Sequence, residues 1–155
     1  MDFQSTIHQM VEFQRKNTFA SSPQITLGEL IKRLTPMVEK NKERVAEGKE
    51  EANVMLDFEY LFPGVLESWR GSYAELAITF SQYGGNEKPP TLTKFYSMLK
   101  EAIGKTYCGY KGGDFTMSES TPVWVANHGH SGNTGVVGVK NNDYEVLILT
   151  AYCEF

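Results

Sequence analysis

Two segments of the chain place aromatic rings beside a cation and small residues. A base can stack on Trp or Tyr, which contributes about 1–3 kcal/mol per base in nucleic-acid complexes. Arg binds a phosphate through two parallel hydrogen bonds and Lys binds it as a point charge, while paired glycines can turn backbone N–H groups toward an anion. These residues therefore predict a pocket for a small phosphorylated or nucleotide-like ligand: Trp69, Arg70, Tyr73, Tyr107, Tyr110, Lys111, Gly112 and Gly113.

The same two segments also fit a purely structural role. Trp69 and Tyr73 can pack at the rim of a sheet, and Arg70 can pair with Glu67 or Glu75. The second segment can equally be a simple hairpin turn. Its K-G-G-D run is not a Walker loop, which needs a different glycine spacing before a helix. Both interpretations stay open at the level of the sequence.

A third segment, VWVANHGHSGNTG, suggests three roles. Its GHSGN core lacks the second glycine of a nucleophile elbow, and no histidine follows His130, so Ser131 is not expected to be catalytic. His128 and His130 could share a metal, but no ligand motif marks a third ligand. The segment is better explained as a loop at the end of a sheet, where Asn127 and His128 would border the predicted ligand pocket.

The first third of the chain reads as helical. Residues 2–16 carry apolar side chains at helical spacing, and Thr-x-x-Glu at 26–29 is a capping box that opens a second helix. Pro36 is expected to interrupt that helix, because proline lacks an N–H and restricts the preceding residue. Residues 37–51 are mostly charged and are interpreted as a solvated helix that ends near Gly48 and has no function.

The rest of the chain reads as strands around one more helix. The expected strands are 54–62 before a Pro63-Gly64 turn, 73–80, 105–110, 122–126 with Trp124 in the core, 135–140 and 144–153 after an Asn-Asn-Asp turn; the helix is 92–103, ended by Gly104. This order predicts an α+β fold: a mainly antiparallel sheet of about five strands, N-terminal helices and one central helix. We expect a single domain over 1–155, with 1–22 a helical extension and 23–155 the α+β core.

Composition narrows the classes of function. The net charge of -4 disfavours non-specific nucleic-acid binding, which needs a basic surface. No apolar run approaches the roughly 20 residues of a transmembrane helix, so no membrane partner is expected. The N-terminus lacks a signal-peptide pattern, and Cys108 and Cys153 are therefore expected to be reduced thiols in the cytoplasm. No cofactor is indicated.

The stretches ITLGELIKRL, DFEYLFPGVLESWRGSYAELAI, GYKGGDFTM and TPVWVAN resemble a family of small accessory proteins carried by bacteriophages and prophages. The resemblance covers roughly residues 25–155. It implies a role against host defences. One such class, the anti-CBASS and anti-Thoeris sponges, generally forms oligomers and binds cyclic nucleotide signals through aromatic and cationic residues without turning them over.

The sequence thus favours a phage-encoded counter-defence protein of the host cytoplasm. It would sequester a nucleotide-derived signal without catalysis, without a cofactor, and as a homo-oligomer if it follows the sponges. One alternative is a protein–protein inhibitor whose exposed aromatic residues engage a host defence enzyme. Another is a metal-dependent nucleotide hydrolase that uses His128 and His130.

Overall fold

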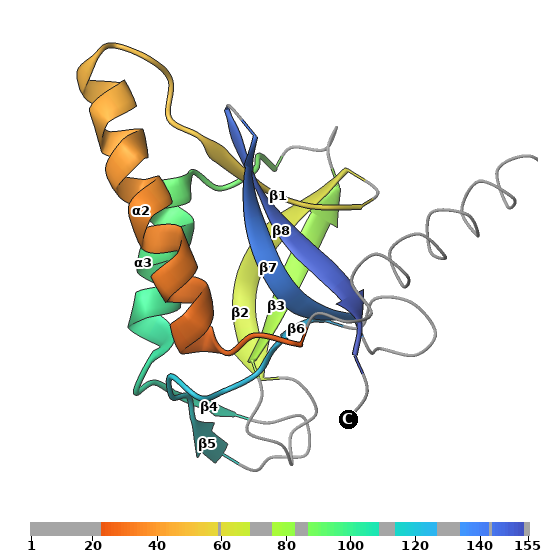
Figure 1. The fold of residues 1–155 in the computed structure, drawn as a ribbon. Helices are drawn as coiled ribbons and strands as arrows, with labels where there is room; N and C mark the ends of the chain where they lie inside the picture. The colour runs from red at the N-terminus through yellow and green to blue at the C-terminus, as the bar shows by residue number, and fades with distance from the viewer. Residues whose placement is uncertain are drawn as a thin grey trace, which may run out of the picture.

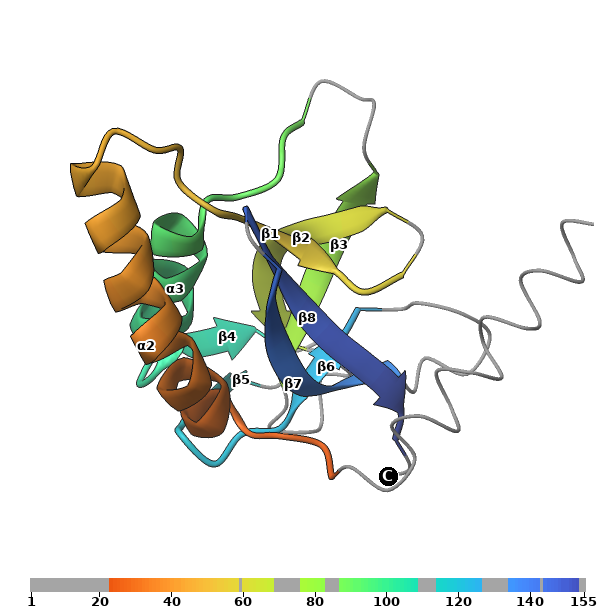
Figure 2. The same cartoon turned by 45° about the horizontal axis from the view of Figure 1, so that its top comes forward.

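The computed structural model describes residues 23–58, 60–68, 76–82, 87–108, 114–126, 134–142 and 144–153. Two helices lie side by side and cover one side of a strongly curved sheet (Figure 1, Figure 2). The α+β class is confirmed. The helix expected at 2–16 lies outside the described residues. No helix within the described ranges has the length and apolar character needed to cross a membrane.

Helix α2, Leu27–Ala46, starts and stops where the sequence predicts. The Thr26 side chain accepts the N–H of Glu29 at 3.2 Å, which satisfies one of the unpaired donors of the first turn. At the other end Gly48 takes a φ of 84°, a conformation that glycine adopts without steric cost. The capping signals therefore fix both ends of this helix.

The predicted interruption at Pro36 is wrong, because α2 runs through it without a break. Proline leaves the carbonyl of Lys32 without its helical donor. Lys32 and Pro36 are both exposed, so water can hydrate that carbonyl. The hydroxyl of Thr35 donates to the carbonyl of Ile31 at 2.9 Å, which adds a side-chain bond beside the gap. The proline is tolerated because it lies on the solvent side.

The main sheet has six strands in the order β1-β8-β7-β6-β3-β2. They are β1 (Asn53–Leu56), β2 (Leu61–Ser68), β3 (Leu76–Gln82), β6 (Val123–Val125), β7 (Thr134–Asn142) and β8 (Glu145–Tyr152). The pairs β1–β8 and β3–β6 are parallel, so the predicted five-stranded, mainly antiparallel sheet is only partly correct. Strand β1 also contacts β2, and the sheet thereby curls toward a barrel.

The turn predicted at Pro63-Gly64 is wrong, because both residues lie within strand β2. The pairing register with β3 shifts between Pro63 and Leu66. Proline is tolerated there because β2 is the last strand in the sheet order and the register shift locally relaxes the ladder. The chain turns earlier, next to Tyr60, which has a φ of 53°.

A small second sheet follows helix α3, Leu92–Ala102, which ends at Gly104 (φ 81°) as predicted. Strand β4, Thr106–Cys108, pairs with β5, Asp114–Thr116. Strand β5 was not predicted.

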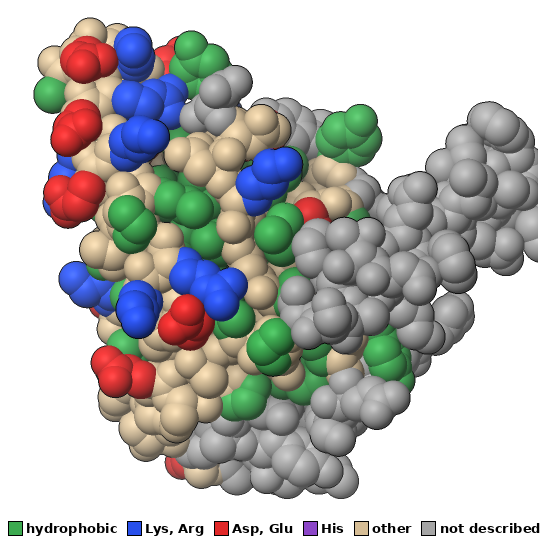
Figure 3. Space-filling model, viewed as in Figure 1, with side chains coloured by type: hydrophobic (Ala, Val, Ile, Leu, Met, Phe, Trp, Pro, Cys, Tyr) green, Lys and Arg blue, Asp and Glu red, His purple; other side chains and the backbone are tan. Residues whose placement is uncertain are grey.

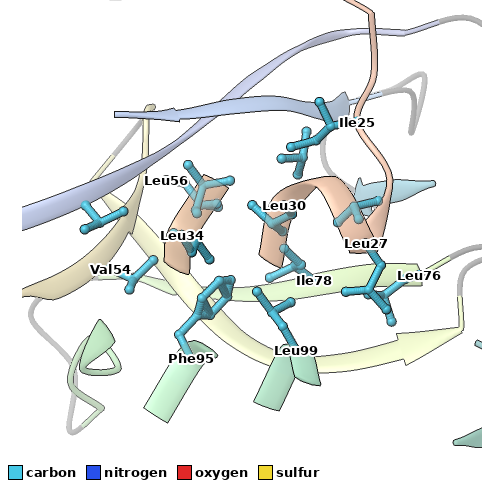
Figure 4. Packing of buried hydrophobic residues seen from close by; sticks show 14 of the residues in the cluster. Ile25, Leu27, Leu30, Leu34, Val54, Leu56, Leu76, Ile78, Phe95 and Leu99 are labelled. Atoms are coloured by element: carbon cyan, nitrogen blue, oxygen red, sulfur yellow. The ribbon is translucent and has the colours of Figure 1, made fainter. Parts of the chain in front are cut away.

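The core lies between the two helices and the concave side of the sheet. Leu30 and Leu34 of α2 meet Phe95 and Leu99 of α3 over the sheet, and all four are fully buried (Figure 4). Each such side chain contributes about 1.5–3 kcal/mol relative to an exposed one. Trp124 is also buried, which confirms its predicted place, but it belongs to a second cluster with Ala77 and Ala126.

Candidate functional site

A cavity of about 630 Å³ lies between the C-terminal half of α2, the segment that follows it and the β7–β8 hairpin. Its volume is within the range of about 300–1,000 Å³ that small-molecule sites occupy. It is lined by Met37, Lys40, Asn41, Arg44, Lys49, Ala52, Leu92, Asn141, Tyr144 and Val146.

One face of α2 supplies four of the lining residues. Met37, Lys40, Asn41 and Arg44 follow the i, i+3, i+4, i+7 spacing that places side chains on one side of a helix. This face overlaps the buried stripe of the first half, since Asn41 is itself only 3% exposed. Where the helix reaches the cavity, the side chains along this stripe are therefore no longer all apolar: they include the amide of Asn41 and the cations of Lys40 and Arg44.

Charges of both signs lie on this half of α2, but the two charged side chains of the helix that line the cavity are both cations. Lys40 and Arg44 stand one turn apart and line the cavity, whereas Glu39, Lys42 and Glu43 do not line it. In Figure 3 the red side chains line the outer edge of α2, while blue ones gather toward the β7–β8 hairpin. Like charges at this spacing destabilise a helix by about 0.2–0.5 kcal/mol per pair. The cavity face of this half of α2 carries a concentration of positive charge.

The end of α2 brings a third cation to the cavity. The N–H of Gly48 donates to the carbonyl of Val45, and the N–H of Lys49 donates to the carbonyl of Arg44, both at 3.0 Å. These two bonds form a Schellman motif, which folds the chain back over the last turn. Lys49 is thereby held beside Arg44. Its exposed pair with Glu47 at 3.3 Å contributes little and can be exchanged.

Asn41 ties the floor of the cavity together. Its Oδ1 accepts the backbone N–H of Ala52 at 2.9 Å, and the carbonyl of Ala52 accepts the N–H of Leu92 at 2.8 Å. Because an N–H group must donate to oxygen, this contact also fixes which end of the amide is which. These two bonds connect α2, the segment before β1 and the start of α3 at the floor of the cavity.

Tyr144 forms an aromatic wall at the rim. Asn142 pairs with Glu145, so Tyr144 lies in a tight hairpin connection, and its carbonyl accepts the N–H of Asn53 at 3.0 Å. The side chain is 62% exposed. The guanidinium carbon of Arg44 lies 4.7 Å from the centroid of its ring, a cation–π contact.

The lining is cationic and amide-bearing around an apolar floor. It combines three cations, two amides and one phenol with apolar side chains, and none of the described lining residues carries a carboxylate, an imidazole or a thiol. Such a set can hold an anion and a ring. The groups in this lining that could take part in acid–base chemistry are the amines of Lys40 and Lys49 and the phenol of Tyr144.

Of the ligand residues predicted from the sequence, Tyr107 is described. Its half-buried ring lies in β4 and packs against the main core, and burial raises the pKa of its phenol. The ammonium of Lys105 lies 5.2 Å from its ring centroid. The others lie outside the described residues and stay predictions: Trp69, Arg70, Tyr73, Tyr110, Lys111, Gly112, Gly113, Asn127 and His128, with His130 of the metal hypothesis.

The strand ends that flank the two aromatic–cation segments lie on the same side of the molecule. Ser68 pairs with Leu76 across the first segment, and Cys108 pairs with Asp114 across the second. Strand β4 contacts β2, and Figure 1 places β4 and β5 below the lower ends of β2 and β3. These ends are remote from the cavity, which lies beside the upper end of α2.

The cavity was missed because 37–51 was interpreted as a solvated helix without function. The available signal was Asn41, at a position where the apolar spacing of Leu27, Leu30 and Leu34 continues. A polar residue at a core position of an amphipathic stripe indicates a partner.

Within the described parts of the chain, no three His, Cys, Asp or Glu side chains cluster closely enough to hold a metal. Comparison of the chain with protein-family models, with curated proteins and with solved structures finds no match.

Proposed function

We propose that this protein binds a small phosphorylated, nucleotide-like ligand in the α2 cavity and holds it without turnover. The observation that carries the proposal is the convergence of Lys40, Arg44 and Lys49 on one cavity beside the exposed ring of Tyr144. The whole chain has a net charge of -4, so this concentration of cations opposes the overall charge. A local positive field of this kind attracts an anion to one place on an otherwise acidic protein.

Sequestration is the role that such a site would serve best. A protein that removes a signal needs affinity alone, and the described lining residues supply cations, hydrogen-bond donors and a stacking surface. The counter-defence role that the phage resemblance implies would follow if the ligand were a cyclic nucleotide of host immunity. The aromatic–cation segments around Arg70 and Lys111 remain the alternative location for the same ligand.

Thermal unfolding with a panel of linear and cyclic nucleotides tests the proposal, since a ligand that binds only the folded state raises the melting temperature. The heated mixture should return the ligand intact. Lys40→Gln should weaken binding, whereas Lys42→Gln makes the same charge change away from the cavity, beside Glu39 at 3.4 Å, and should not.

Each contrary outcome has a definite meaning. Equal losses in the two variants would indicate unspecific charge attraction. Loss in Arg70→Gln without loss in Lys40→Gln would move the site to the aromatic–cation segments. A hydrolysed product would favour the hydrolase alternative, and no shift with any nucleotide would contradict the proposal.

A further inference from the structure

The cavity has a gradient of polarity from floor to rim. At the floor, Ala52, Leu92 and Val146 are each 2% exposed or less. At the rim, Lys40 is exposed and the side chain of Lys49 retains 57% of its accessible surface. Burial of an ionised phosphate against an apolar floor costs far more than burial of an uncharged ring. A ligand with both parts therefore enters ring first and leaves its phosphate at the rim.

The floor contains one polar group that is incompletely satisfied. The oxygen of the Asn41 amide accepts the N–H of Ala52, and no hydrogen bond joins its Nδ2 to another described residue. The side chain is only 3% exposed and lines the cavity. Nδ2 is not one of the fully buried, unpartnered side-chain atoms of the described residues. Water in the cavity can therefore reach it, and a ligand acceptor would take the place of that water.

Building on the proposed function, we infer that Asn41 determines specificity: its Nδ2 donates to acceptor atoms on the edge of a base held in the floor, while the phosphate meets Lys40 and Lys49. Guanine presents two neighbouring acceptors, O6 and N7, on one edge, whereas adenine presents an acceptor beside an amino donor. An asparagine reads adenine through both its oxygen and its nitrogen. The oxygen of Asn41 is already engaged by Ala52, so the free donor favours an oxo-bearing purine over adenine.

The test compares GMP, AMP and ribose 5-phosphate on the full chain by titration calorimetry. The wild-type protein should bind GMP more tightly than AMP by about three- to tenfold, the size of one hydrogen bond, and ribose 5-phosphate most weakly. Asn41→Asp keeps an oxygen for the N–H of Ala52 but removes the donor, so the GMP/AMP ratio should fall to about one. Asn141→Asp adds the same charge to the cavity wall; it should weaken both nucleotides equally and keep the ratio.

GMP and AMP carry the same phosphate, so a change of charge in the cavity alters both affinities alike and leaves their ratio unchanged. The ratio therefore tests the role of Asn41, and the affinities themselves test the proposed function. Equal wild-type affinities for GMP and AMP, tighter binding of AMP, or an unchanged ratio in Asn41→Asp would overturn the role of Asn41 and leave nucleotide binding intact. If neither nucleotide binds, the proposed function fails and the inference fails with it. The wild-type comparison alone decides if Asn41→Asp does not fold.

Discussion

The two halves of helix α2 use the same spacing for opposite purposes. In the first half Leu27, Leu30 and Leu34 are fully buried against α3 and the sheet. In the second half the neighbouring face presents Lys40 and Arg44 to a cavity, and these like charges stand one turn apart. Burial of the leucines in the first half stabilises the fold, whereas repulsion between like charges in the second half slightly destabilises the helix. That difference is the reason we propose the α2 cavity as the binding site.

The largest expected effect removes a side chain from the apolar half. Leu30→Ala should lower the free energy of unfolding by about 2–5 kcal/mol, because a cavity opens in a core that cannot collapse around it. Urea denaturation measures the loss. Met37→Ala, in the half that lines the existing cavity, is the matched control and should cost clearly less, since Met37 is only partly buried. Equal losses would contradict the division of the helix.

The apolar half was predictable from the sequence because buried side chains of a helix recur at helical spacing. The capping box at 26–29 and the leucines after it predict the start and the buried face of α2. The predicted end near Gly48 is confirmed, and Gly48 there has a φ of 84°. What could not be predicted is pairing at long range. Strand β1 lies parallel to β8 across about ninety residues, and hydrophobic alternation gives the face of a strand but not its neighbour.

The cavity depends on the same long-range pairing. Its walls come from α2, the end of the Schellman motif and the β7–β8 hairpin, and only the fold brings Tyr144 to Arg44. The aromatic–cation segments, in contrast, could be predicted as a ligand pocket because their residues are adjacent in the sequence. Adjacency is the easier signal to see, but a site assembled from distant segments leaves only isolated polar residues in apolar positions, such as Asn41.

Pro36 lies at the junction of the two halves, and its replacement should raise stability. In a helix interior proline is less favourable than alanine by about 3 kcal/mol, so Pro36→Ala should stabilise the protein by up to that amount. The new N–H can donate to the carbonyl of Lys32. Thermal or urea unfolding measures the gain, with ligand affinity as the control that should not change. A loss of stability would mean that α2 needs the proline to follow the sheet.

Substitution of Gly48 tests the C-terminal half of α2, because it changes the preferred backbone conformation there without adding a clash. No atom lies within 4 Å of where a Cβ would stand, so Gly48→Ala brings strain at φ 84° and no clash. The free energy of unfolding should fall by about 1 kcal/mol, and by less for Gly48→Asn, which tolerates this conformation better. Ligand affinity should fall with it, since the Schellman motif positions Lys49. Unchanged affinity in Gly48→Ala would remove Lys49 from the site.

The smallest effect decides whether the charges of the second half are there for the helix or for a ligand. Lys40→Gln relieves the repulsion between Lys40 and Arg44 and should raise the free energy of unfolding by about 0.2–0.5 kcal/mol. Lys42→Gln removes the partner of Glu39 and should lower it slightly or leave it unchanged. High salt screens exposed charges and should shrink both differences. If Lys40→Gln instead destabilises the protein without ligand, Lys40 supports the fold, and the concentration of cations at the cavity loses its functional meaning.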